Sequence, residues 1–220
     1  MNRAISLLPL VLFVVACASS SKPVDMTQPR RVLGTEADVR LDALVYSDRL
    51  SESTSIPITY DITNHRSSTI LVADMLPLAT YDPETLTVTV ALGSEIPGEN
   101  FLPRLIAVRP EEKKSFTTVA HVAIVARPGT PWSPRPNQVR IKLNFLGDTK
   151  PFAQLVDIHE KAVYDPKLAA DLFTKWVDGN ETVLTNTLPM RWTGGGVGAA
   201  VTDAPTFVQP RRGGRRGDRP

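Results

Sequence analysis

The sequence predicts a mainly β protein, an antiparallel sandwich with one α-helix near its C-terminal end. Two observations predict this class. Several short stretches alternate apolar and polar residues with period two, and turn-forming residues separate them. A convincing helical pattern follows only after residue 165. Because the strands follow one another without intervening helices, we expect two antiparallel sheets packed around one core.

The first segment has the three parts of a secretory signal peptide. Arg3 supplies positive charge, residues 4–15 are almost wholly apolar, and small residues lie on both sides of Cys17. The apolar run is about twelve residues long, whereas a helix that spans a bilayer needs about 20. We therefore expect residues 1–16 to be a cleaved signal peptide.

The stretch Val14-Val15-Ala16-Cys17 resembles the lipobox of bacterial lipoproteins, and Cys17 is the only cysteine in the chain. The alternative is a chance cysteine in an ordinary signal peptide. The resemblance implies that diacylglycerol alkylates the Cys17 thiol and that cleavage occurs just before it. Acylation of the new amino terminus, for instance with palmitate, occurs in many members. Ala18 is not the aspartate that retains many lipoproteins at the inner membrane, so the resemblance implies the outer membrane, facing the periplasm or the cell surface.

The charge of the chain is divided between a body and a tail. Of the formal net charge of +2, Arg3 contributes one and residues 194–220 contribute +3, which leaves −2 for residues 17–193. Residues 17–35 are mostly polar, contain two prolines and lack an apolar period. We expect them to be a lipidated tether that lifts the domain off the membrane.

The period-two stretches predict a β-sandwich domain over residues 36–160. The clearest strands are 56–62, 86–92 and 139–145, and weaker ones are 38–46, 69–74, 104–109, 115–126 and 152–159. The segments IPITYDITNHRSSTILVAD, VRPEEKKSFTTVAHV and NQVRIKLNFLGD resemble bacterial immunoglobulin-like or fibronectin-type-III-like domains over roughly residues 38–160. The resemblance implies the sandwich architecture and carries no function of its own.

Residues 161–193 predict a helix and a last strand that pack on the sandwich. Asp165 fits the N-cap, Pro166 the first helical position and Gly179 the end, and apolar residues between them share one face. A partner-binding helix is the alternative. The last strand is expected between Thr182 and Leu188.

The C-terminal segment, residues 194–220, is rich in Gly, Pro and Arg, so we expect it to be disordered. Its guanidinium groups can bind phosphates and carboxylates. In the envelope these anions belong to acidic lipids or polysaccharides, and we expect no nucleic-acid partner because the signal peptide directs the chain out of the cytosol. The candidate residues are Arg211, Arg212, Arg215 and Arg216.

A second candidate contact is Trp132, in the proline-rich stretch 127–137, because proline presets an extended backbone that a partner can recognise. The alternative is a loop whose Trp132 packs back on the sandwich. The histidines suit surface or sheet positions better than catalysis, and Asp157 with His159 lacks further metal ligands that the sequence identifies. We expect no enzyme activity and no cofactor.

These observations predict a membrane-anchored bacterial envelope lipoprotein that acts as a non-enzymatic structural or interaction module, with another envelope protein as a candidate partner. The alternative is an envelope protein that binds a small ligand or a metal ion.

Overall fold

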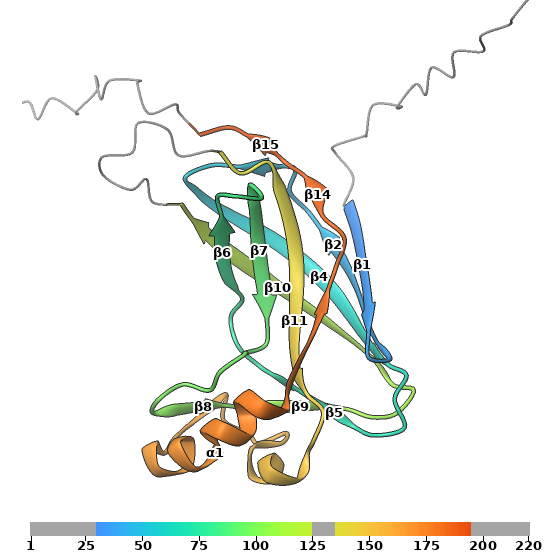
Figure 1. Cartoon of the computed structure of the whole chain (residues 1–220), viewed down its shortest axis with the longest axis vertical. Coiled ribbons are helices and arrows are strands. Elements are labelled where there is room, and N and C mark those ends of the chain that lie inside the picture. The colour runs from blue at the N-terminus through green and yellow to red at the C-terminus, as the bar shows by residue number, and fades with distance from the viewer. Residues whose placement is uncertain (1–29, 125–134, 195–220) are drawn as a thin grey trace, which may run out of the picture.

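The computed structural model describes residues 30–124 and 135–194 (Figure 1). Strands make up most of this part of the chain. They are β1 (Arg30–Glu36), β2 (Val39–Val45), β3 (Arg49–Leu50), β4 (Ser53–Asn64), β5 (Ile70–Ala73), β6 (Leu78–Asp82), β7 (Thr87–Leu92), β8 (Phe101–Pro103), β9 (Leu105–Val108), β10 (Lys113–Ala123), β11 (Gln138–Leu146), β12 (Ala162–Tyr164), β13 (Asn180–Leu184), β14 (Leu188–Pro189) and β15 (Arg191–Trp192). The helices are the 3₁₀-helix η1 (Lys150–Leu155) and α1 (Pro166–Gly179). The prediction of a mainly β protein is confirmed.

One large sheet runs in the order β1-β2-β4-β10-β6-β7-β11-β5-β9, and β13 and β14 also pair with β11. The sheet curls so far that β13 lies beside β1 (Figure 1). Two hydrogen bonds join β1 to Asn186, which lies two residues after the end of β13: the Leu33 amide donates to Asn186 Oδ1 over 2.8 Å, and the Asn186 amide donates to the Leu33 carbonyl over 3.1 Å. The two halves of the curled sheet therefore face each other across a shared interior.

The sheet is mixed, so the expectation of a wholly antiparallel arrangement is wrong at two pairs of strands. β7 and β11 run parallel over six positions, from Gln138↔Thr87 to Leu143↔Leu92. β10 and β6 are also parallel, at the single position His121↔Leu78. Parallel neighbours need a long crossover, and here residues 93–137, with β8, β9 and β10, return the chain to the starting end of β7.

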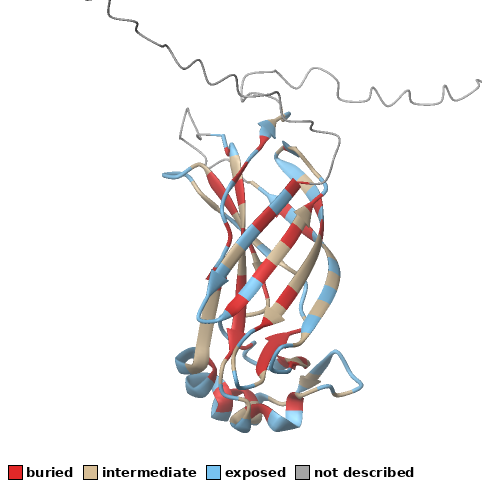
Figure 2. Ribbon diagram, turned by 90° about the vertical axis from the view of Figure 1, so that its right-hand side faces the viewer, coloured by how far each residue is buried: buried red, intermediate tan, exposed pale blue. Residues whose placement is uncertain are grey.

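The main core lies between the two halves of the sheet and follows the predicted alternation. In β11 the inward residues Val139, Ile141 and Leu143 are at most 1% exposed, while Arg140 and Lys142 between them are only partly covered. Figure 2 shows this banding along several strands. The predicted inward face of residues 56–62 is buried in the same way at Ile56 and Ile58.

A second core lies at one end of the sheet, beneath α1 (Figure 1). Trp176 packs edge-on against Phe152 of η1, with 5.5 Å between ring centroids. The predicted helix is confirmed, including its cap, because the Asp165 carboxylate accepts a hydrogen bond from the Leu168 amide over 2.9 Å. The strand expected over residues 152–159 is wrong: Pro151 and a tight turn produce η1 there instead.

The folded part begins earlier than the sequence indicates. β1 starts at Arg30 and buries Val32 completely, so residues 30–35 belong to the sheet and not to a tether. The pattern was missed because Gly34 and Thr35 interrupt the apolar alternation after Leu33. No helix among the described residues is long and apolar enough to cross a membrane.

Candidate binding pocket

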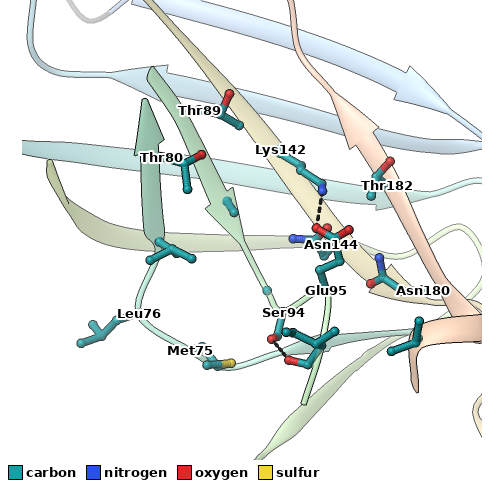
Figure 3. Close-up of a pocket in the computed structure, with 15 residues that line it drawn as sticks. Met75, Leu76, Thr80, Thr89, Ser94, Glu95, Lys142, Asn144, Asn180 and Thr182 are labelled. Atoms are coloured by element: carbon teal, nitrogen blue, oxygen red, sulfur yellow. Dashed lines mark hydrogen bonds and ion pairs between the residues drawn. The ribbon is translucent and has the colours of Figure 1, made fainter. Parts of the chain in front are cut away.

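A pocket of about 610 Å³ opens on the outer face of the sheet, next to α1 (Figure 3). Its floor comes from the side of β6, β7, β11 and β13 that faces away from the main core. The floor residues are Thr80, Thr89, Ala91, Lys142, Asn144 and Thr182. They occupy outward positions because their neighbours in each strand, such as Val90 and Leu143, point into the core.

The wall after β7 is held by a glycine and a tryptophan. Gly93 has a φ of +70°, and a Cβ there would lie 2.5 Å from the Asn144 carbonyl oxygen, so only glycine fits this exit from the strand. The next carbonyl, that of Ser94, accepts a hydrogen bond from Trp176 Nε1 over 3.0 Å. Because Trp176 is a buried residue of α1 itself, this hydrogen bond fixes the wall relative to the helix.

Aliphatic side chains surround the opening although they face solvent. Leu76 is 81% exposed, Leu78 66% and Ile96 55%, and Met75 and Val177 are also exposed. Scattered apolar residues are normal on a protein surface, whereas a group of them around one hollow marks a binding site. Fully covering one such side chain contributes about 1.5–3 kcal/mol, which makes this rim the strongest source of binding energy at the pocket.

The charged groups of the pocket neutralise each other. Lys142 Nζ lies 2.6 Å from Glu95 Oε2 (Figure 3). Lys142 is mostly covered by its neighbours on the floor, while Glu95 is 64% exposed on the wall. The pocket lining thus has no net charge, and a neutral ligand suits it better than an ion.

Two amide oxygens in the pocket lining lack a hydrogen-bond donor: Asn144 Oδ1 and Asn180 Oδ1 are both buried without a partner. Asn144 is 2% exposed, and its Nδ2 donates to the Leu92 carbonyl over 3.4 Å, at the outer limit of a hydrogen bond. An unsatisfied buried acceptor costs about 1–3 kcal/mol. A ligand that donates N–H or O–H groups recovers this free energy.

The site residues indicated by the sequence lie outside the described residues. These are Cys17, Trp132, Arg211, Arg212, Arg215 and Arg216. Their proposed roles stay predictions. The expected disorder of residues 194–220 also stays a prediction, because residues 195–220 lie outside the described part of the chain.

No histidine lines the pocket, although His121 pairs with Leu78 of the rim across β10 and β6. His65 Nδ1 is 3.3 Å from Glu111 in a turn, and His121 Nδ1 is 3.0 Å from the Ser55 hydroxyl on the outer face of β10. His159 is exposed beyond η1. Within residues 30–124 and 135–194, no group of three or more His, Cys, Asp or Glu side chains is arranged to hold a metal ion.

Comparison of the chain with known proteins gives no matching family model, no matching curated protein and no matching solved structure. The pocket therefore has to be interpreted from its own chemistry.

Sequence reasoning missed the pocket, because its parts are far apart in the chain. One local signal was present: Met75-Leu76-Pro77-Leu78 is a run of apolar residues that does not alternate with polar ones, as a half-buried strand would. In β6 none of the residues is fully buried, so this strand lacks the inward apolar stripe that identifies strands in a sequence.

Proposed function

We propose that this protein is a bacterial envelope lipoprotein, anchored to the membrane through Cys17, whose β domain is a non-enzymatic binding module. We also propose that this domain belongs to the immunoglobulin-like class, which residues 38–160 resemble. The outer membrane is its proposed location. The arginines of the C-terminal segment, from Arg211 to Arg216, add an electrostatic contact with acidic lipid or polysaccharide.

The observation that carries the binding role is the ring of exposed aliphatic side chains around the pocket. Evolution keeps such side chains off a solvent-facing sheet surface unless something covers them, because they promote nonspecific association. The polar groups of the pocket are hydroxyls, amides and one internal ion pair, and such groups can orient a bound ligand by hydrogen bonds.

The position of the pocket suits a tethered module. Arg30, where the chain from Cys17 enters the sheet, lies at the start of β1, and β1 runs from there towards the end that carries α1 (Figure 1). The pocket is at the α1 end. A domain held through its N-terminal strand would present this end away from the anchor.

The anchor is tested by Cys17→Ala. We expect the variant to lose labelling by radioactive palmitate and to accumulate as an uncleaved or wrongly cleaved precursor, because only the thiol is alkylated in the lipobox reaction. Membrane fractionation of the unaltered chain tests the outer-membrane location. Label uptake by the Cys17→Ala chain would refute lipidation at this residue.

The binding role is tested by photo-crosslinking in the envelope of cells that make the full lipidated chain. A benzophenone amino acid replaces Leu76 at the pocket or, as the matched control, Val119, which is 39% exposed on β10 outside the pocket lining. We expect a discrete crosslinked species from position 76 that disappears when Leu78→Ser is added, and no such species from position 119. Identical products from both positions would count against a binding role for the pocket.

A further inference from the structure

We propose that the pocket binds an extended peptide segment of a partner protein, with an aliphatic side chain inside the aliphatic rim and backbone N–H groups donating to the amide oxygens of Asn144 and Asn180. This inference rests on the proposed binding role of the pocket and adds the chemistry of the ligand. Three properties of the pocket lead to it.

The first property is the balance of charge. Lys142 and Glu95 form an ion pair within the lining, so an additional anion would compete with Glu95 and an additional cation would compete with Lys142. A ligand without net charge leaves this pair intact. Peptide backbone and aliphatic side chains meet that condition, whereas a fatty acid or an amine does not.

The second property is the direction of the missing hydrogen bonds. Both unsatisfied groups, Asn144 Oδ1 and Asn180 Oδ1, are acceptors, so the ligand must bring donors. The Asn144 oxygen is covered in the absence of a ligand, but the terminal torsion of an asparagine is soft and its amide nitrogen holds the Leu92 carbonyl only at 3.4 Å. The proposed contact therefore requires this amide to rotate until its oxygen faces the ligand.

The third property is the aliphatic rim. Leu76 just before β6, Leu78 at the start of β6 and Ile96 from the loop after β7 have branched aliphatic side chains, and Val177 of α1 also lines the pocket. Among the described residues no aromatic ring lines the pocket, and its two charged groups, Lys142 and Glu95, are paired with each other, so an aliphatic side chain fits the rim. An extended peptide that contains leucine or isoleucine supplies both groups, because its backbone N–H donors lie beside an aliphatic side chain.

The test uses the mature lipidated full chain in phospholipid nanodiscs, which avoids detergent that would itself enter the pocket. It is titrated with acetyl-Ala-Leu-Ile-Ala-amide and with a twin peptide methylated on the Leu and Ile backbone nitrogens. The twin has more apolar surface but lacks two N–H donors. NMR shifts of the Asn144 and Asn180 side-chain amides report binding at the pocket.

We expect the parent peptide to shift both amides and the methylated twin to bind at least about tenfold more weakly, since one lost charge-neutral hydrogen bond to a buried acceptor is enough for that factor. Asn144→Leu should reduce the difference between the two peptides, and Leu76→Ser should weaken both. Val119→Ser, outside the pocket lining, should leave both affinities unchanged.

Several results would overturn the inference. Equal binding of the two peptides would mean that the donors are unused, and tighter binding of decanoate than of the peptide would identify an anionic amphiphile instead. In either case the pocket still binds, so the proposed function stands. Failure of all these probes, together with identical crosslinks from positions 76 and 119, would remove the proposed function as well.

Discussion

Replacing Gly34 by alanine tests whether contact between β1 and β13 closes the sheet. A Cβ at Gly34 would lie 2.3 Å from the Leu184 carbonyl oxygen and 3.0 Å from Val183 Cγ1. Real Cβ atoms do not approach a heavy atom within 3.0 Å, so the two strands must separate until the first distance has grown from 2.3 Å to at least 3.0 Å. The obstacle is backbone, which cannot rotate away as a flexible side chain would.

The same separation stretches the two hydrogen bonds between Leu33 and Asn186, now 2.8 and 3.1 Å long, to or beyond the 3.5 Å limit. Each such bond contributes about 0.5–1.5 kcal/mol, and overpacking of a tight site costs about 1–3 kcal/mol. Taking the lower limit of each contribution, we expect Gly34→Ala to lower the free energy of unfolding by at least about 2 kcal/mol. For a domain of this size that corresponds to a fall of roughly 4–8 °C in melting temperature.

The assay is urea unfolding of the full chain, with Gly179→Ala as the matched control. A Cβ at Gly179 meets no atom within 4 Å, and this residue ends α1, so alanine there should be neutral or stabilising by up to about 1 kcal/mol. If Gly34→Ala unfolds at the same urea concentration as the parent, β1 does not press against β13 and the closure is wrong.

Three further predictions concern the core, the pH dependence and the tail. Leu143→Asp should cost about 4 kcal/mol or more by burying an unpaired charge, whereas Val119→Asp on an outer face should change stability by less than about 1 kcal/mol, as urea titrations of both variants would show. The hydrogen bond from Arg31 lowers the pKa of Asp42, so this pair should stabilise the fold above about pH 4 and lose its effect as the pH falls. Asp42→Asn should therefore be less stable than the parent at pH 7 and should lose less stability between pH 7 and pH 3. An equal fall of the urea midpoint in parent and variant between these two pH values would contradict this. Deleting residues 194–220 should leave the melting temperature unchanged but weaken binding to anionic vesicles at low salt, and unchanged vesicle binding would show that the arginines of this segment lack that role.

Part of the fold was readable from the sequence because it depends on local periodicity. Val139, Ile141 and Leu143 recur every second residue, and in the structure they point into one core. The helix was equally local, since Asp165 caps it and Pro166 begins it within a few residues of chain. Such patterns need no knowledge of distant segments.

The arrangement of strands was decided by tertiary structure. An alternating strand has the same pattern whether its neighbour runs parallel or antiparallel, so the parallel pairing of β7 with β11 left no trace in residues 87–92 or 138–146. β1 was hidden for a related reason: its place in the sheet depends on β2 and on Asn186, about 150 residues later in the chain.

The sequence by itself determined the mainly β class, the inward faces of the clearest strands, the capped helix and the lipobox-like stretch before Cys17, because each is written in neighbouring residues. Only the tertiary structure decided the pocket. Asn144 occupies an outward, nominally solvent-facing position of β11, yet it is buried because Gly93 turns the chain over it and Trp176 holds that turn against α1. Burial of a polar side chain by segments 50 residues upstream and 30 downstream is a property of packing, and no local pattern of residues encodes it.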